Sequence, residues 1–293
     1  MRIGVDLGGT KIEAAALDDA GIVRARRRAL TPQRDYAGTV QTVVRLVREV
    51  ECEIGETVPT LGLATPGAVS PATGRIKNAN STCLIGERLD ADLARALERE
   101  VRLANDADCF ALSEAVDGAG QGADVVFGVI LGTGVGGGIV AHGRLLSGPN
   151  AIAGEWGHNP LPWPHDDERP GPECYCGRHG CIETFLSGPG LARASGREDR
   201  SAETVVRAAA GGDARAEAVL TRYVERLSRS LAAVINLLDP DVIVLGGGLS
   251  NIERLYRDVP ALWSEYVFSD RVDTRLLRNV HGDSGGVRGA AWL

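Results

Sequence analysis

Three features are missing from this sequence of 293 residues, and each absence disfavours a class of protein. No apolar run approaches the roughly 20 residues that a membrane-spanning helix needs. No signal-peptide core follows the N-terminal MRIGVDLGGTK, which enters a strand almost at once. No basic excess is present, since the formal net charge is -7, and this disfavours general binding to nucleic acid. We therefore expect a cytoplasmic protein with no membrane and no nucleic-acid partner.

The basic residues that do cluster, at 24–28, form a short run on an expected strand. A solvated strand edge accounts for such a run better than a docking patch does. Disulfides are rare in the cytoplasm, so we do not expect the six cysteines to form a disulfide framework. Cys52, Cys83 and Cys109 are scattered along the chain, and we expect them to be buried thiols.

The 38 glycines gather in short runs, which indicates tight turns and close approach of the backbone to ligands. Two runs separate pairs of expected strands, and a third follows a strand near the end; they lie at 8–9, 132–138 and 246–248. Other strands are expected at 22–30, 60–64 and 101–104, with helices at 36 to about 52, 90–100 and after 107. The repeated strand–turn–strand scheme predicts two related α/β domains that enclose a cleft.

The first glycine run is a candidate phosphate site. The motif Asp6-x-Gly8-Gly9-Thr10-Lys11 lies at a tight turn between two strands, where backbone N–H groups can approach phosphate oxygens closely. Thr10 can add a hydroxyl donor, and Asp6 can hold a metal-bound water that faces the phosphates. A plain hairpin is the other interpretation, because short glycine motifs produce many false positives.

The second candidate phosphate site is Gly132-Thr133-Gly134-Val135-Gly136-Gly137-Gly138. Gly132, Gly134 and Gly137 also satisfy the G-x-G-x-x-G dinucleotide fingerprint, but that fingerprint requires a helix to begin at the turn. A strand is expected at 139–141 instead, so we favour a phosphate-binding hairpin. The P-loop pattern G-x-x-x-x-G-K-[ST] does not occur, which excludes the P-loop kinases.

A cluster of cysteines suggests a metal site. Cys174, Cys176 and Cys181 lie on one short loop bent by glycines, and the C-x-C spacing is poorly suited to a disulfide. Three thiolates need a fourth ligand to complete a zinc tetrahedron. His158 is the first candidate for that ligand, with His165 and His179 as substitutes. Such a closed site would be structural, and three reduced buried cysteines are the alternative.

The stretch between His158 and the cysteines, PLPWPHDDERPGPE at 160–173, is expected to be an irregular loop because of its prolines.

Carboxylates mark a candidate catalytic position. Asn105-Asp106 follows an expected strand, where catalytic side chains of α/β proteins commonly lie. Phosphoryl transfer to a hydroxyl needs one carboxylate to accept the proton, and Asp106 fits that role. Capping of the next helix is the other interpretation of Asp106, and Asp108 could share either task. Glu155 and Glu183 flank the cysteine loop and could accept hydrogen bonds from sugar hydroxyls, or simply be solvated.

Taken in order, these motifs resemble those of the ROK family of bacterial sugar kinases and related repressors, over essentially the whole chain. The matching segments are DLGGTK at 6–11, Asn105-Asp106, GTGVGGG at 132–138, GEWGH at 154–158, CYCGRHGCIE at 174–183 and VLGGG before Leu249. Four longer segments favour the fructokinase/mannokinase branch: KNANSTCL at 77–84, VRLANDADCFALSEAVDGA at 101–119, GEWGHNPLPW at 154–163 and HGDSGGVRGAAWL at 281–293.

The resemblance implies an α/β fold of the actin-like ATPase (ribonuclease H-like) type, with two α/β domains around a central cleft. Residues 1–117 would form the N-terminal domain, joined by the final helix at about 283–293. Residues 118–282 would form the C-terminal domain, which carries the zinc loop. The resemblance also implies a homodimer.

The family further implies an ATP-dependent hexose kinase that phosphorylates the 6-hydroxyl of fructose or mannose, with Asp106 as general base. The sugar would be bound by Gly67, Thr82, Asn105, Asp106, Glu155, His158 and Glu183. ATP, with its Mg²⁺, would be bound by Asp6, Gly8, Gly9, Thr10, Lys11, Gly132, Thr133, Gly134, Gly136, Gly137, Gly138, Gly246, Gly247 and Gly248. Structural Zn²⁺ would be bound by His158, Cys174, Cys176 and Cys181. One ring nitrogen of His158 would face the metal and the other the sugar.

Several alternatives remain at this point. Within the family, the substrate could be N-acetylglucosamine or glucose. A sugar-responsive repressor would carry a helix-turn-helix before the kinase-like part, and DLGGT begins too early for one. A non-catalytic sugar sensor is disfavoured by the intact Asp106 and both glycine turns. An NAD-dependent dehydrogenase would show thermal protection by NAD rather than ATP.

Overall fold

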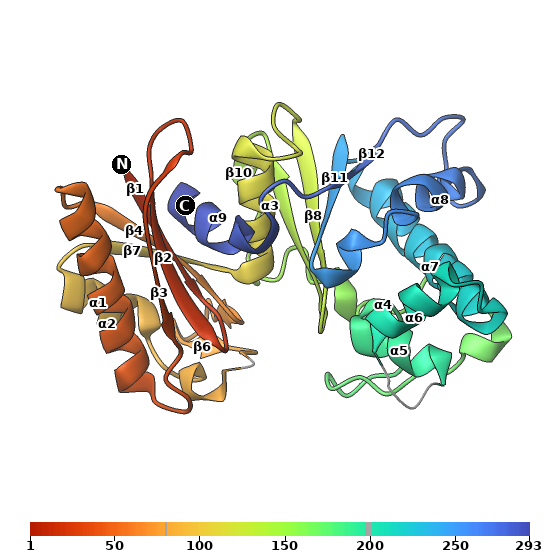
Figure 1. The fold of residues 1–293 in the computed structure, drawn as a ribbon, viewed down its shortest axis with the longest axis horizontal. Coiled ribbons are helices and arrows are strands. Elements are labelled where there is room, and N and C mark those ends of the chain that lie inside the picture. Colours follow the sequence, from red (N-terminus) through yellow and green to blue (C-terminus); the bar gives the residue numbers. More distant parts are fainter. Residues whose placement is uncertain (80, 197–200) are drawn as a thin grey trace. The chain divides into compact units, whose positions relative to one another are not determined.

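A computed structural model describes residues 1–79, 81–196 and 201–293; Asn80, within the KNANSTCL segment, lies outside the described residues. The chain forms two compact units, which Figure 1 shows coloured along the sequence. Unit 1 comprises Met1–Gly122, Gly138–Ala153 and His281–Leu293, and unit 2 comprises Ala123–Gly137 and Gly154–Val280. The domain boundaries expected from the sequence stay a prediction.

Unit 1 contains a five-stranded sheet in the order β3-β2-β1-β4-β7. Its strands are β1 (Arg2–Leu7), β2 (Lys11–Leu17), β3 (Val23–Leu30), β4 (Thr60–Thr65) and β7 (Glu100–Asn105). β1 pairs antiparallel with β2 and parallel with β4, which pairs parallel with β7. The carboxyl ends of β1, β4 and β7 therefore meet at one edge of the sheet, where ligand-binding side chains of α/β proteins gather.

Helices cover both faces of this sheet (Figure 1). α1 (Tyr36–Ile54) and α2 (Leu89–Leu97) pack on one face, where Val43, Leu46, Val47 and Val50 form the buried stripe of α1. α1 begins at the Asp35 cap, whose side chain accepts from the Gly38 amide, and ends at Gly55 in the left-handed conformation. α3 (Asp106–Asp117) and α9 (Gly285–Trp292) cover the other face.

Glycines allow α9 to approach the sheet closely. A Cβ atom on Gly62 would lie 1.6 Å from the Ala290 carbonyl oxygen, and one on Gly4 would lie 2.1 Å from the Val287 carbonyl oxygen. On the helix itself, a Cβ on Gly289 would lie 1.7 Å from the Cys109 carbonyl oxygen. No side chain fits at these positions, so the C-terminal helix packs backbone against backbone on β1, β4 and α3.

A second five-stranded sheet, whose strands β8, β11 and β12 belong to unit 2, has the order β10-β9-β8-β11-β12, so the two sheets share one pattern of strand order. Its strands are β8 (Val125–Leu131), β9 (Val135–Ala141), β10 (Arg144–Leu145), β11 (Val242–Gly246) and β12 (Arg275–Arg278). The boundary between the units falls within β9, after Gly137. The helices of unit 2 are α4 (Ile182–Leu186), α5 (Gly188–Ser195), α6 (Ala202–Ala210), α7 (Ala214–Leu238) and α8 (Leu255–Ala261).

The structure corrects several expectations. β9 begins at Val135, so the glycine turn is shorter than the predicted 132–138 and the dinucleotide alternative lacks its helix. The proline-rich stretch 160–173 is not wholly irregular, because a short 3₁₀ helix, Asp166–Glu168, forms within it. Of the three scattered cysteines only Cys109 is buried, whereas Cys83 is half-buried and Cys52 is exposed. The basic run lies on β3, an edge strand, as expected.

No helix among residues 1–79, 81–196 and 201–293 is long and apolar enough to cross a membrane.

Candidate functional site

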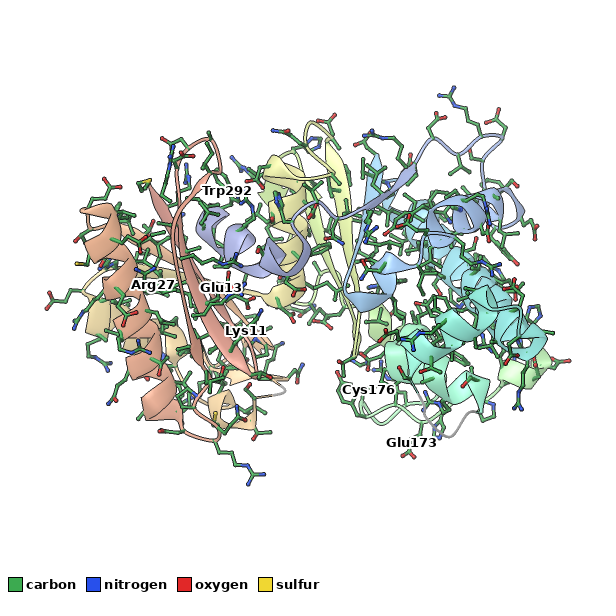
Figure 2. All side chains as sticks on the ribbon, viewed as in Figure 1. Lys11, Glu13, Arg27, Glu173, Cys176 and Trp292 are labelled. Carbon is green, nitrogen blue, oxygen red and sulfur yellow. The ribbon has the colours of Figure 1, made fainter. Side chains whose placement is uncertain are left out.

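The first glycine turn connects β1 to β2. The Gly8 amide donates to the Lys11 carbonyl at 3.0 Å, which closes the turn. A Cβ on Gly8 would lie only 2.9 Å from that carbonyl oxygen, so glycine suits this position. Gly9 and Thr10 lie at the tip and are exposed. Lys11 begins β2, where Figure 2 labels its side chain.

The carbonyl groups of this turn are held by a segment that the sequence did not single out. The Thr31 hydroxyl donates to the Gly8 carbonyl at 2.7 Å, and the Gln33 amide donates to the Gly9 carbonyl at 2.9 Å. The Thr31 backbone amide donates to the Thr10 carbonyl at 3.0 Å. Three successive carbonyls are thus occupied by protein donors. The sequence signal was that Thr31 directly follows β3, the strand that pairs with β2.

Two carboxylates of unit 1 have raised pKa values. Burial raises the pKa of Asp6 to about 6, and the charges of Asp106 and Glu13 add to the effect. Desolvation also raises the pKa of Asp106, although its side chain is accessible to solvent. An accessible carboxylate with a raised pKa is a suitable proton acceptor.

Asn105, not Asp106, caps α3. The Asn105 Oδ1 atom accepts from the Asp108 amide at 2.6 Å, which is the usual N-cap geometry. Asp106 is the first residue of the helix itself, and its Oδ1 atom accepts from the adjacent Ala107 amide at 2.9 Å. The cap leaves the Asn105 amide NH₂ group for other contacts.

Two further predicted sugar ligands also belong to unit 1. Gly67 has φ +78°, and a Cβ there would lie 2.3 Å from the Lys77 carbonyl oxygen, so local packing already requires glycine. Thr82 begins a short 3₁₀ helix, Thr82–Leu84. Thr82 also lines a cavity of about 370 Å³ together with Gly9, Thr31 and Gln33.

In unit 2, the turn Gly132-Thr133-Gly134 connects β8 to β9. The Gly132 amide donates to the Gly134 carbonyl at 3.0 Å, and the Gly132 carbonyl accepts from the Gly188 amide at 2.8 Å. The Glu183 Oε2 atom accepts from the Val135 amide at 3.0 Å. The turn is therefore fixed to the start of α4 and α5.

The remaining glycines of this run lie in β9. A Cβ on Gly137 would lie 2.8 Å from the Trp156 ring, and one on Gly138 would lie 2.6 Å from the Ala107 carbonyl oxygen. Gly136 accepts at its carbonyl from the Trp156 indole N–H at 3.0 Å. Close packing accounts for Gly137 and Gly138 without a nucleotide, and their predicted contact with ATP stays a prediction.

The third glycine run ends β11. Gly246 is the last residue of the strand and Gly248 begins a 3₁₀ helix, Gly248–Asn251. Gly247 has φ +78°, and a Cβ there would lie 2.4 Å from the Leu131 carbonyl oxygen. This turn therefore packs directly against the end of β8.

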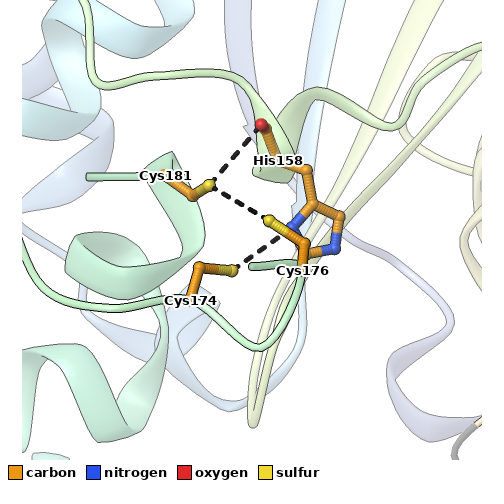
Figure 3. Close-up of side chains that lie close together, drawn as sticks. All are labelled: His158, Cys174, Cys176 and Cys181. Carbon is orange, nitrogen blue, oxygen red and sulfur yellow. Dashed lines mark hydrogen bonds between the residues drawn. The ribbon is translucent and has the colours of Figure 1, made fainter. Parts of the chain in front are cut away.

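The predicted metal ligands come together in unit 2 (Figure 3). One ligand atom from each of His158, Cys174, Cys176 and Cys181 lies within 4.8 Å of all the others. The His158 Nδ1 atom is 3.5 Å from the Cys174 sulfur, and the Cys176 and Cys181 sulfurs are 3.6 Å apart. Three thiols and one imidazole match the ligand set of a structural zinc site. The predicted substitutes His165 and His179 do not belong to this group.

His158 and its neighbours adjoin this cluster. A 3₁₀ helix, Trp156–His158, follows Glu155 and is anchored by the buried Trp156 ring, which packs edge-on against Phe127. The His158 Nε2 atom lies 2.9 Å from the Tyr175 hydroxyl. Although the Tyr175 ring is largely exposed, desolvation at its hydroxyl end and the charges of Glu183, Cys174 and Glu155 raise its pKa to about 12. Tyr175 is a second residue that the sequence did not single out.

Two α/β sheets of one strand order, each with a glycine turn after its first strand, define the class of actin-like ATPases. The ROK family model matches residues 2–293. The chain therefore belongs to the ROK family, and this prediction is confirmed together with the α/β actin-like fold.

Known relatives span the whole chain. An N-acetyl-D-glucosamine kinase from Vibrio parahaemolyticus is 39% identical over 300 residues, which cover 100% of this chain and 99% of the relative. A ROK hexokinase from Thermus thermophilus matches with a TM-score of 0.88 and 30% identity, over 99% of this chain and 96% of that one. A ROK glucokinase from Streptomyces griseus, solved with glucose and AMPPNP, matches with a TM-score of 0.79 and 28% identity, over 99% and 97% of the two chains.

Proposed function

We propose that this ROK-family sugar kinase transfers the γ-phosphoryl group of ATP to the 6-hydroxyl of N-acetylglucosamine, with Asp106 as general base. The main support is the full-length similarity to the N-acetyl-D-glucosamine kinase of Vibrio parahaemolyticus. The accessible Asp106 carboxylate at the start of α3 supplies the chemistry that such a reaction needs.

The choice of sugar departs from the first interpretation of the sequence. The segments at 77–84, 101–119, 154–163 and 281–293 favoured fructose or mannose. The similarity to an N-acetylglucosamine kinase along 100% of the chain supports the alternative more strongly. Fructose and mannose are therefore comparison substrates in the assay, and N-acetylglucosamine is the leading candidate.

In the proposed reaction Asp106 accepts the proton of the sugar 6-hydroxyl. The hydroxyl oxygen then forms a bond to the γ-phosphorus, the bond from that phosphorus to the β,γ-bridging oxygen breaks, and ADP leaves. Asp106 must be ionised before the proton moves. Its raised pKa places the acidic limb of kcat/KM at higher pH than an ordinary aspartate would.

Other roles follow the family resemblance. Asn105, Glu155, His158 and Glu183 are assigned to the sugar, and the turns at Gly8 and Gly132 to the phosphates. Bound Mg²⁺ would neutralise phosphate charge, and the Asp6 carboxylate is the residue suited to hold its water shell. Carboxylates and water are the ligands that Mg²⁺ prefers, so the residue fits the ion.

The cluster of His158, Cys174, Cys176 and Cys181 fits zinc by ligand type and by mutual distance. Bound through Nδ1, the imidazole would keep Nε2 for a second partner, which fixes its tautomer. The metal would hold the loop that carries Tyr175 and leads into α4.

The first test is ADP release with N-acetylglucosamine, glucose, mannose and fructose. We expect the highest kcat/KM with N-acetylglucosamine, and a loss of about 10²–10⁴-fold in kcat for Asp106→Asn, since that is the usual contribution of a general base. Asp19→Asn, an exposed aspartate 4.0 Å from Arg2, is the matched control and should keep wild-type rates. A higher kcat/KM with fructose or mannose would support the fructokinase/mannokinase interpretation instead. Full activity of Asp106→Asn would contradict the assignment of Asp106 as general base.

The zinc assignment has a separate test. Metal analysis of purified protein should give one zinc per chain, and Cys176→Ser should lose it and weaken sugar binding through displacement of His158. Cys52→Ser, at an exposed cysteine outside the cluster, should keep both. Normal zinc content in Cys176→Ser would contradict the ligand assignment.

A further inference from the structure

Glu183 contacts the second glycine turn directly. Its Oε2 atom accepts a hydrogen bond from the Val135 amide at 3.0 Å. A Cβ on Gly134 would lie 2.7 Å from the same oxygen, so the carboxylate rests against the backbone of the turn. Within the described part of the chain, the Oε1 atom has no hydrogen-bond partner. One oxygen therefore holds the turn while the other stays available.

A neighbouring contact ties the turn to the start of the next helix. The Gly188 amide, at the beginning of α5, donates to the Gly132 carbonyl at 2.8 Å. Together with the bond from Val135 to Glu183, this contact fixes both ends of the turn. The orientation of the peptide groups at 133 and 134 is thus set from outside the hairpin.

The helix that carries Glu183 begins in the cysteine cluster. Cys181 is the N-cap residue of α4, and its carbonyl accepts from the Thr184 amide at 2.9 Å and the Thr184 hydroxyl at 2.7 Å. The Ile182 amide donates to the Asn159 carbonyl at 2.9 Å, next to His158. The cluster and the glycine turn are therefore joined through a single helical turn.

We propose that Glu183 is a positioning residue for the nucleotide as well as a sugar ligand, and that it couples the two binding events. This inference rests on the proposed function. A sugar hydroxyl on Oε1 would restrict the carboxylate, and Oε2 would then hold the phosphate turn in its binding geometry. The coupling is positive and reciprocal, because the ligand that binds first orders the Glu183 side chain and the turn, and the second ligand then binds at a lower entropic cost.

The test measures affinity for AMPPNP by calorimetry, with and without saturating N-acetylglucosamine. Without sugar, Glu183→Ala should weaken AMPPNP binding about tenfold, as expected for the loss of one hydrogen bond to a charged acceptor. Sugar should tighten AMPPNP binding several-fold in the wild type and leave it unchanged in Glu183→Ala.

Glu183→Gln separates the two roles. Its amide oxygen can still accept from Val135, so AMPPNP affinity should stay within about twofold of wild type while sugar affinity falls. Because glutamine preserves the shape of the side chain, this variant also serves if Glu183→Ala does not fold. Thr184→Val is the matched control: it loses a hydrogen bond in α4 without contacting the turn, and should bind AMPPNP normally.

Unchanged AMPPNP affinity in Glu183→Ala would overturn the inference, leaving Glu183 a sugar ligand only. An equal loss in Thr184→Val would also overturn it, because any disturbance of α4 would then suffice. If wild-type protein binds AMPPNP but turns over no sugar, the proposed function fails instead, and the sugar-free AMPPNP series still decides the role of Glu183 toward the turn.

Discussion

Asp6 lies at the end of β1 with two other acidic residues in electrostatic reach. Burial, then Asp106 and Glu13, raise its pKa from 3.8 to about 6, while Lys11 opposes the shift. A Cβ on Gly286 would lie 2.7 Å from the Asp6 Oδ2 atom, so the first turn of α9 leaves room for the carboxylate only because glycine stands there. The charge is therefore held in place at a cost to the folded state.

This cost predicts a pH-dependent effect of Asp6→Asn. The folded protein binds the Asp6 proton more tightly than the unfolded chain, so the stabilisation is complete below pH 3.8 and is lost as pH rises through about 6. Asp6→Asn removes this cost. The difference in unfolding free energy between Asp6→Asn and wild type should therefore rise, in favour of the variant, by up to about 3 kcal/mol from pH 4 to pH 8. Urea denaturation at both pH values measures it, and an equal effect at both would contradict the prediction. Asp19→Asn is the control.

At the residue level the sequence predicted types of side chain better than their tasks. Asn105 and Asp106 were predicted at a strand end, and they lie there. Which of them caps α3 depends on the backbone at the helix start, because only the residue outside the first turn can accept from the Asp108 amide. Thr31 was missed for a similar reason: its partner, the Gly8 carbonyl, is brought near it by strand pairing and not by the sequence nearby.

At the scale of elements, the proline-rich loop is anchored by a buried ion pair. Glu168 accepts from Arg226 at 2.7 Å and from Arg229 at 2.9 Å, and both arginines belong to α7. Burial by itself would raise the pKa of Glu168, but hydrogen bonds from Arg226, the His165 amide and Arg229 lower it to about 2. Arg229 is only 1% exposed, and Glu168 is its nearer carboxylate; the Glu225 Oε1 atom lies 3.5 Å from the Arg229 Nε atom.

We expect Glu168→Gln to destabilise the protein by about 3–5 kcal/mol at pH 7, because it removes the nearer counter-charge of the buried Arg229 and leaves only the more distant Glu225. In the wild type this stabilisation is present above pH 4.5 and is lost as pH falls toward 2. Chemical denaturation measures the effect. Glu203→Gln, which breaks an exposed pair with Arg207, should cost less than about 1 kcal/mol. Similar losses in the two variants would show that the loop is not anchored in this way.

The glycine run of β9 is a place where the sequence did not predict the secondary structure. Consecutive glycines indicate a turn from sequence alone, yet Gly137 and Gly138 lie in a strand because a ring and a helix backbone approach them. Proline content likewise predicted an irregular stretch at 160–173 and gave no indication that Glu168 would be buried against α7. In both cases the deciding contact is distant along the chain.

At the scale of the whole molecule, the repeat of strand, glycine turn and strand predicted the α/β class, and the matching strand order of the two sheets is the reason. The grouping of three cysteines with His158 could be predicted because the spacing of the cysteines restricts them to one loop, and His158 is the added fourth member; that they bind a metal stays a prediction. The sugar could not, since discrimination among hexoses depends on hydrogen-bond geometry that side-chain types do not encode.

The scarcity of lysine among the basic residues of the chain has a practical consequence. Only two of its 32 lysine and arginine residues are lysines, Lys11 and Lys77. Lys11 is exposed at the foot of the first glycine turn, and Lys77 donates to the Asn150 carbonyl at 3.3 Å. An amine-directed reagent therefore has almost no sites to modify besides these and the terminal amine. The extent of Lys11 modification, measured by peptide mapping, would therefore report on the accessibility of the first glycine turn, with Lys77 as an internal reference.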